Sequence, residues 1–256
     1  MVANAQHAAT ETHQFMTEIA LLDDLRSFGD LKVWSFLVTL FGDLAAEEGA
    51  ELSGPLVSRL STRLGIKPEA LRVALHRLRK DGWIESRREG REARYGLTDT
   101  ARIETKAVHD IVYSSTMAQP AQVLLLTFET APPKSAGIPI APRCVLSTHP
   151  APDALATTFD VTAMPPWVRD CLTSAEQTES YVSLLSRLTP YAESDTFSSE
   201  DKLVLRLIIL HRWRRIVLRH DPLAAALMGQ HWVGADCRST VTELLASLPR
   251  SLIDDL

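Results

Sequence analysis

The chain has 256 residues, of which 45% are hydrophobic and 23% are charged, a globular composition that excludes a disordered or collagen-like protein. Its apolar stretch from Leu203 to Leu210 is interrupted by Arg206 and is much shorter than the ~18 residues that span a membrane. Three scattered cysteines without metal-ligand spacing, and a polar start without a secretory signal, predict a cytoplasmic protein with reduced thiols and no metal site.

The charge is distributed unevenly along the chain. The segment from Pro55 to Tyr95 contains eleven Lys and Arg and five Asp and Glu, so it carries +6 (eleven minus five). Since the whole chain carries −5, the remainder carries −11. This asymmetry predicts an anion-binding module attached to an acidic body.

Two helices are expected before residue 45: a short amphipathic one around Phe15 to Phe28 and a strongly apolar one over Lys32 to Leu44. A linker follows. Ser53 or Gly54 can then cap a helix that has a proline in its first turn and stops at Gly65.

Pro68 is expected to open another helix, which runs to about Asp81. Two strands are predicted after it, over Trp83 to Arg87 and Ala93 to Leu97, with a turn at Glu89 to Arg91. Two helices separated by a turn with glycine, then a β-hairpin, is the element order of a winged helix-turn-helix.

The second of these helices has two different faces. Its predicted buried side consists of Leu71, Ala74, Leu75 and Leu78. Its predicted exposed side consists of Glu69, Arg72, Val73, His76, Arg79 and Lys80. A basic face of this kind can enter a major groove, where arginine reads guanine edges, while an arginine-rich hairpin contacts phosphates or the minor groove. The candidate DNA-binding residues are Lys67, Arg72, His76, Arg79, Lys80, Arg87, Arg88, Arg91 and Arg94.

A solvated basic face on a structural hairpin is the alternative interpretation, and His76 taken alone is almost as well explained as a surface histidine without a role. DNA binding is favoured because three features coincide: the spacing of the two helices, the leucine stripe and the basic hairpin.

Two parts of the sequence resemble PaaX-type transcriptional regulators. Phe36 to Asp43 (FLVTLFGD), Glu69 to Arg91 (EALRVALHRLRKDGWIESRREGR) and Tyr95 to Thr98 (YGLT) are similar to the N-terminal domain of that family, and His211 to Gly234 to its C-terminal segment. The marking positions of the second match are Arg214, Arg215, Arg219, Asp221, Pro222, Trp232 and Gly234. The resemblance implies a cytoplasmic, dimeric bacterial transcription factor, usually a repressor of phenylacetate catabolism that phenylacetyl-coenzyme A releases from its operators.

The middle of the chain departs from this pattern. Nine of the fourteen prolines lie between Pro120 and Pro166, which excludes long helices there. Strands are predicted over Gln122 to Phe128, Arg143 to Ser147 and Thr157 to Val161. The resemblance implies a small ferredoxin-like domain, similar to CRISPR-associated endonucleases. Because Glu129 to Gly137 is too short for its first helix, either the domain is reduced or the two sequences are misaligned.

The chain from about Trp167 onward is predicted to be helical. One or two helices reach Leu188, and a loop follows from Pro190 to Thr196. A helix capped by Ser198 or Ser199 then runs to about His220. Because this helix is apolar on more than one side, it is either central to its domain or shared with a partner subunit.

Arg214 continues an apolar stripe of three leucines on this helix, and a buried arginine needs a partner. One interpretation is an ion pair with Asp221 or another carboxylate. The other is that Arg214, Arg215 and Arg219 hold the phosphates of an acidic effector such as an acyl-coenzyme A.

An enzyme is not expected, because the chain has no G-x-S-x-G, no phosphate-binding glycine loop and no cysteine with a neighbouring histidine. Asp153 and Asp160 lack the further carboxylates that would hold Mg²⁺ for a nuclease. No catalytic residue and no cofactor are therefore predicted.

The predicted fold class is mainly α with small β elements (α+β). Its parts are an N-terminal extension (1–30), a winged-helix DNA-binding domain (31–115), a β-rich, reduced ferredoxin-like middle domain (116–166) and a helical domain for dimerisation and effector binding (167–256). The predicted function is a homodimeric, operator-binding repressor of an aromatic-acid catabolic operon, relieved by an acyl-coenzyme A. A winged-helix module that docks a protein, and not DNA, is the alternative.

Overall fold

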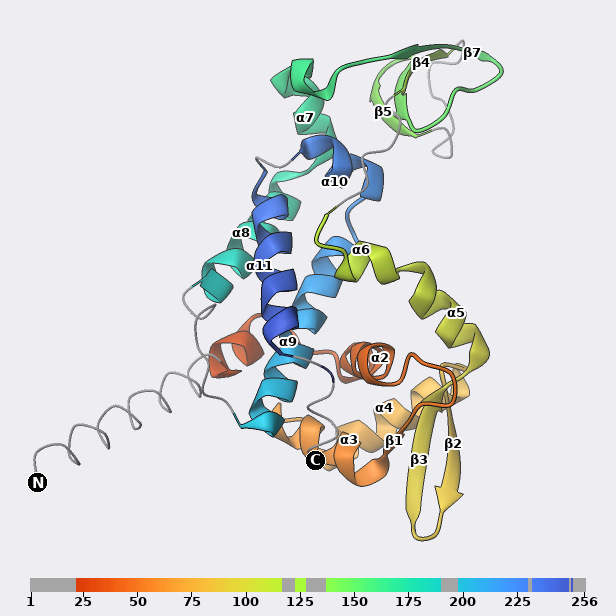
Figure 1. Ribbon diagram of the computed structural model, residues 1–256, viewed down its shortest axis with the longest axis vertical. Coiled ribbons are helices and arrows are strands. Elements are labelled where there is room, and N and C mark those ends of the chain that lie inside the picture. Colours follow the sequence, from red (N-terminus) through yellow and green to blue (C-terminus); the bar gives the residue numbers. More distant parts are fainter. Residues whose placement is uncertain are drawn as a thin grey trace, which may run out of the picture.

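The protein is described here by a computed structural model that covers residues 22–116, 123–127, 137–189, 198–229, 232–248 and 250. Helices form the middle of an elongated molecule, and two small antiparallel sheets lie at its opposite ends (Figure 1). The predicted α+β class is confirmed in this general form. Of the first predicted helix, residues 22–27 are helical and the residues before them lie outside the described part.

The lower end in Figure 1 carries the basic segment. Its elements are α2 (Val33–Leu44), β1 (Glu51–Ser53), α3 (Gly54–Arg63), α4 (Pro68–Lys80), β2 (Ile84–Glu89) and β3 (Glu92–Leu97). The Oγ of Ser53 accepts a hydrogen bond from the amide of Leu56 at 3.3 Å, so the predicted cap of α3 is confirmed. Strand β1 is not predicted by the sequence. It is a three-residue strand, and only its pairing with Arg94–Gly96 of β3 defines it.

Two further helices, α5 (Asp99–Ala107) and α6 (His109–Tyr113), connect the hairpin to the central helices. Thr98 caps α5, because its Oγ1 accepts a hydrogen bond from the amide of Ala101 at 3.3 Å. Tyr113, at the end of α6, donates its hydroxyl to Asp43 on α2 at 2.9 Å. These contacts bring the chain back onto α2 after the hairpin.

The upper end is a four-stranded antiparallel sheet with the order β5-β6-β4-β7. The strands are β4 (Val123–Thr127), β5 (Ile138–Ala141), β6 (Cys144–Ser147) and β7 (Ala154–Thr158). Two predictions were wrong in detail. Arg143, predicted to begin a strand, has a φ of +65° in the turn before β6. The last strand begins at Ala154, and the end of its predicted range at Val161 is instead the start of a 3₁₀ turn.

Five helices complete the chain: α7 (Pro166–Leu172), α8 (Ala175–Leu188), α9 (Ser199–Val217), α10 (Pro222–Met228) and α11 (Val233–Ser247). Ser198 caps α9 by accepting a hydrogen bond from the amide of Asp201 at 3.2 Å. Every residue of α9 from Leu203 to Trp213 is buried. This helix is therefore central within the chain itself, which is one of the two predicted alternatives.

One hydrophobic core extends through both the lower end and the central helices, from Leu25 to Leu248. Helix α2 joins the two parts, because it packs against α4 and also against α9. The upper sheet has smaller clusters of its own, one of them shared with α7 and α10. None of the described helices combines the length and the apolar character that crossing a membrane requires.

Candidate nucleic-acid interface

Helix α4 separates its apolar and basic residues onto opposite faces. Leu71, Ala74 and Leu78 are buried and Leu75 is half-buried, as the spacing predicts. The predicted outward residues are all exposed: Glu69, Arg72, Val73, His76, Arg79 and Lys80. The helix starts with a proline and an acidic residue and ends with basic residues in its last turn, an arrangement that complements the helix dipole.

The β2–β3 hairpin lies beside α4 and turns one of its faces toward it. Arg79 of α4 donates a hydrogen bond from Nη1 to the Oγ of Ser86 on β2 at 3.2 Å. Because side chains alternate along a strand, Arg88 shares this face with Ser86. Arg91 follows Gly90 in the turn of the hairpin, where Gly90 has a φ of +61°. Arg88 and Arg91 are exposed.

Arg87 and Arg94 lie on the opposite face of the hairpin and are held by carboxylates. The Nε of Arg87 lies 2.7 and 2.9 Å from the two carboxylate oxygens of Glu51, and the Nε of Arg94 lies 2.8 Å from Glu89. The hydrogen bond from Arg87 lowers the pKa of Glu51 and in turn raises that of Arg87. The structure therefore separates the four predicted hairpin contacts into two ion-paired arginines, Arg87 and Arg94, and two exposed arginines, Arg88 and Arg91.

Other cations of the basic segment also have acidic neighbours. Arg72 lies 3.5 Å from Glu69, and Arg63 pairs with Glu200 and Asp201 at the start of α9. Three of the nine predicted DNA contacts, Arg72, Arg87 and Arg94, make ion pairs. Within the part of the chain that the structure describes, the other six make none: Lys67, His76, Arg79, Lys80, Arg88 and Arg91.

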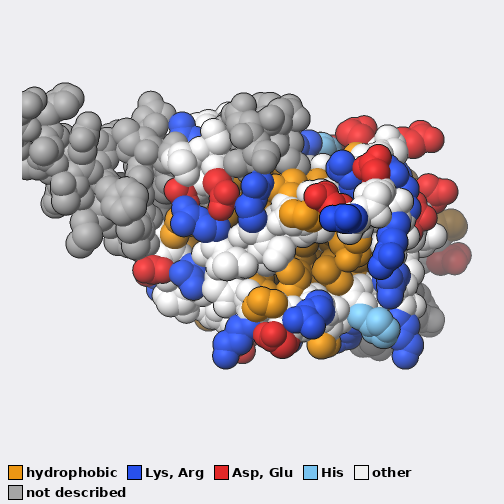
Figure 2. Space-filling view, turned by 90° about the horizontal axis from the view of Figure 1, so that it is seen from below, with side chains coloured by type: hydrophobic (Ala, Val, Ile, Leu, Met, Phe, Trp, Pro, Cys, Tyr) orange, Lys and Arg blue, Asp and Glu red, His pale blue; other side chains and the backbone are white. Residues whose placement is uncertain are grey.

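The end of the molecule seen from below shows basic side chains around an exposed apolar area (Figure 2). Val33, Trp34, Ala70 and Val73 line a shallow hollow of 350 Å³ between α2 and α4. The guanidinium of Arg77 lies over the Trp34 ring, 5.4 Å from its centroid. Cations distributed over a helix and a hairpin can contact several phosphates, and the apolar hollow adds a different kind of contact surface.

The three predicted effector arginines do not lie together. Arg215 and Arg219 line a hollow of 530 Å³ beside the N-terminus of α8, whereas Arg214 lines a separate cavity of 150 Å³ under α5 and α6. Arg214 donates a hydrogen bond to Thr39 Oγ1 at 3.2 Å, and burial lowers its pKa. The predicted pair with Asp221 is wrong, because Asp221 caps α10 and accepts a hydrogen bond from the amide of Leu223 at 2.8 Å.

Three buried arginines were not predicted as anchors. Arg206 pairs with Asp43, Arg212 donates to backbone carbonyls at the end of the helix at 22–27, and Arg238 donates to the carbonyls of Ile111 and Ser114. Arg206 could have been found from the sequence, because it interrupts an otherwise apolar stretch of α9. Its carboxylate partner lies 163 residues away and gives no local signal.

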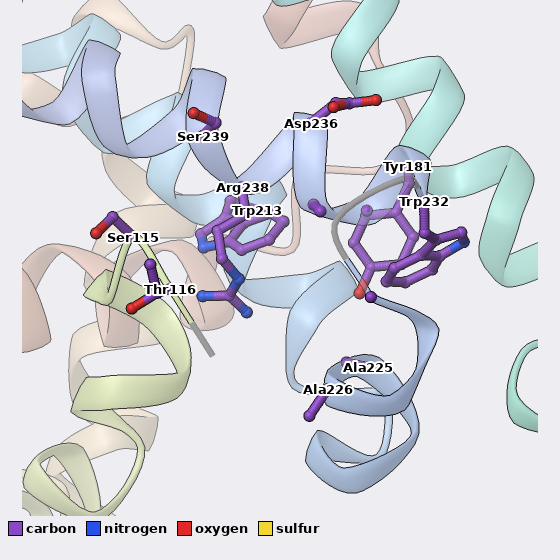
Figure 3. Close-up of a pocket in the computed structure, with 13 residues that line it drawn as sticks. Ser115, Thr116, Tyr181, Trp213, Ala225, Ala226, Trp232, Asp236, Arg238 and Ser239 are labelled. Carbon is purple, nitrogen blue, oxygen red and sulfur yellow. The ribbon is translucent and has the colours of Figure 1, made fainter. Parts of the chain in front are cut away.

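A cavity of 490 Å³ is lined by residues of α8, α9, α10 and α11 and of the segment that follows α6 (Figure 3). Arg238 and Trp213 lie on one side of it, and Tyr181 and Trp232 lie on the other. The Trp232 ring stands over Gly234, where a Cβ would lie 2.1 Å from it, so the glycine is required for this packing. In the described residues, no group of three or more His, Cys, Asp or Glu is placed to hold a metal ion.

Comparison with known proteins identifies the class. Residues 32–101 match the family model described as PaaX-like protein, and residues 173–251 match the PaaX-like protein C-terminal domain. The chain is 24% identical over 241 residues to the transcriptional repressor PaaX of Escherichia coli (strain K12), covering 80% of this chain and 76% of that protein. These matches identify a transcriptional regulator. The chain belongs to the PaaX-like family, and the prediction that it is not an enzyme is confirmed.

Proposed function

We propose that this protein is a sequence-specific DNA-binding repressor of the cytoplasm. In this proposal, α3, α4 and the β2–β3 hairpin form a winged helix-turn-helix. Helix α4 enters the major groove, and the hairpin contacts the adjacent backbone or minor groove. The observation that carries the proposal is the set of basic side chains that make no ion pair with a described residue along α4 and the hairpin: Lys67, His76, Arg79, Lys80, Arg88 and Arg91.

The two arginines on the outer face of α4, Arg72 and Arg79, both fit this role. Arg72 is 3.5 Å from Glu69, and both side chains are more than two-thirds exposed. Arg79 is bonded to a hydroxyl, not to a carboxylate. Exposed pairs of this kind contribute little to stability, so both guanidinium groups are available to phosphates or guanine edges.

The protein is proposed to act as a homodimer on two operator half-sites, because one winged helix reads few base pairs. For the effector we propose an acyl-coenzyme A of an aromatic acid, in line with the family resemblance. Arg215 and Arg219 line the same hollow with the buried Arg212, so they are the better candidates for its phosphates. Arg214 has no place in this set, since it lies in the other cavity.

The upper sheet supports the proposal of a reduced ferredoxin-like middle domain. If β4, β5, β6 and β7 are numbered one to four in chain order, their order in the sheet is two, three, one, four. Neighbouring strands are antiparallel. A ferredoxin-like sheet has this order. The connection from β6 to β7 is a loop over 148–153 in place of the second helix.

Fluorescence anisotropy of the protein on the DNA upstream of its own coding region, compared with random DNA over a range of salt concentrations, tests the proposal. We expect preferential binding that weakens steeply as salt rises, because several phosphates are contacted. Phenylacetyl-coenzyme A should release the complex, and this release should be lost in Arg215→Ala with Arg219→Ala. Binding that persists with the thioester contradicts that effector. Equal binding to the upstream DNA and to random DNA contradicts repression through this DNA and favours a protein-docking module.

A further inference from the structure

Val73 is an apolar side chain on the face of α4 where the sequence otherwise places charges. It is 70% exposed, the largest exposed fraction among the large hydrophobic residues that the structure describes. Arg72 precedes it, and His76 and Arg77 follow one turn later, so Val73 lies among polar and charged neighbours on the helix surface. A β-branched residue here neither fills the core nor favours the helix.

A single exposed valine needs no explanation, but Val73 belongs to a continuous apolar surface. Trp34 at the start of α2 is 40% exposed, and the two side chains line the same hollow of 350 Å³, which Ala70 also lines. Arg77 closes one side of this hollow through its contact with the Trp34 ring. The hollow thus combines methyl-sized apolar contacts with the charged side chains of Glu69 and Arg77. The rest of the outer face of α4 is basic, since Arg72, Arg79 and Lys80 are exposed on it.

A partner that fits this surface presents negative charge beside small apolar groups. The major groove of DNA has these two properties, since phosphates border it and the C5-methyl of each thymine projects into it. We propose that Val73 contacts a thymine methyl group and thereby selects an A·T or T·A pair at one position of each half-site. The inference rests on the proposed entry of α4 into the major groove.

The experiment starts by selecting a binding sequence from a random DNA library with the full-length protein. Each thymine of the selected sequence is then replaced singly by uracil, which removes only the methyl group. For the unmodified protein we expect one position per half-site where uracil weakens binding about fourfold. This change in affinity corresponds to the free energy of burying one methyl group. Val73→Ala should bind thymine and uracil equally at that position. Val182→Ala, which shortens an exposed valine on α8, should keep the discrimination.

The outcomes separate the two proposals. If the protein selects no sequence, the proposed function fails and the inference fails with it. If a sequence is selected but every thymine tolerates uracil, or Val73→Ala keeps the discrimination, only the inference is overturned. Circular dichroism should show equal melting of both valine variants, since both side chains are exposed. A change in sedimentation mass with Val73→Ala, without a change in thymine discrimination, would assign the hollow to a second copy of the chain.

Discussion

Asp43 of α2 and Arg206 of α9 form a two-point ion pair in the middle of the core. The distances are 2.6 Å from Nε to Oδ2 and 2.8 Å from Nη2 to Oδ1, and the two side chains are 0% and 5% exposed. Burial alone would raise the pKa of Asp43, but the hydrogen bonds and charges of Arg206 and Arg250 lower it below its ordinary value. The remaining donors of Arg206 reach the carbonyls of Leu245 and Leu248 at 2.8 Å, so one guanidinium links α2, α9 and the end of α11.

Asp43→Asn should lower the free energy of unfolding by about 3–5 kcal/mol, because it leaves the charge of Arg206 buried without an opposite charge. Urea denaturation at neutral pH measures this. Arg250→Ala is the matched control, since Arg250 contacts the same carboxylate but is 41% exposed, and its removal should cost much less. Equal losses in the two variants would contradict the assignment of Arg206 as the principal partner.

His211 should make stability depend on pH between about 3 and 6.5. Burial, assisted by Arg212, Arg215 and Arg214, lowers its pKa to about 3, and its Nδ1 lies 3.2 Å from Thr39 Oγ1. The unfolded chain takes up a proton on this histidine below about pH 6.5 and the folded chain does not, so stability falls as the pH falls through this range. At pH 5 the contribution is about 2 kcal/mol.

The test for His211 compares urea unfolding at pH 7 and pH 5 in the unmodified protein and in His211→Gln. The loss of stability between the two pH values should be smaller in the variant by about 2 kcal/mol. His220 is also buried and its pKa is also lowered, so the difference between the two proteins is the informative quantity. The same loss in both would show that His211 binds its proton equally well when the chain is folded.

Arg212→Met should loosen the segment 22–30. The guanidinium donates hydrogen bonds to the carbonyls of Leu25, Arg26 and Gly29 at 3.1–3.2 Å, and these carbonyls lie at the end of a short helix, where backbone carbonyls need partners from outside the helix. Hydrogen exchange of the backbone amides of residues 22–30 should accelerate at least tenfold relative to the amides of α5, which Arg212 does not contact. Arg215→Ala, which removes one bond to Asp30, should have a smaller effect.

Arg88 and Arg87 are adjacent on β2 but should affect DNA binding differently. Arg88→Ala should reduce the slope of log affinity against log salt by about 0.9, the value for one phosphate contact. Arg87→Ala should change the slope little, because Arg87 is already paired with Glu51 on the other face. Anisotropy titrations at several salt concentrations measure both. Arg169→Ala on α7 serves as the control for loss of an exposed positive charge, and a larger effect of Arg87 than of Arg88 would refute the division of the hairpin faces.

The sequence predicts those features that depend on neighbouring residues. The cap at Ser53, the start of α4 at Pro68 and the buried stripe of α4 are all confirmed, because each depends on spacing within one helix. The pairing of β1 with β3 and of Arg87 with Glu51 brings together residues that are far apart in the chain, and local patterns do not encode such contacts. For the same reason the sequence could not show that Arg214 faces Thr39 and not Asp221.

Helix α2 contacts α9 through Phe36, Thr39 and Asp43, which follow one another at helical spacing, while its other side supports α4. A chain cut after Leu97 would expose this stripe to water and leave the carboxylate of Asp43 without Arg206. The elements proposed to bind DNA are therefore contiguous in the sequence, but their fold depends on contacts with α9. To fold in another protein, these elements have to be transferred together with α9, although α9 follows the upper sheet in the chain.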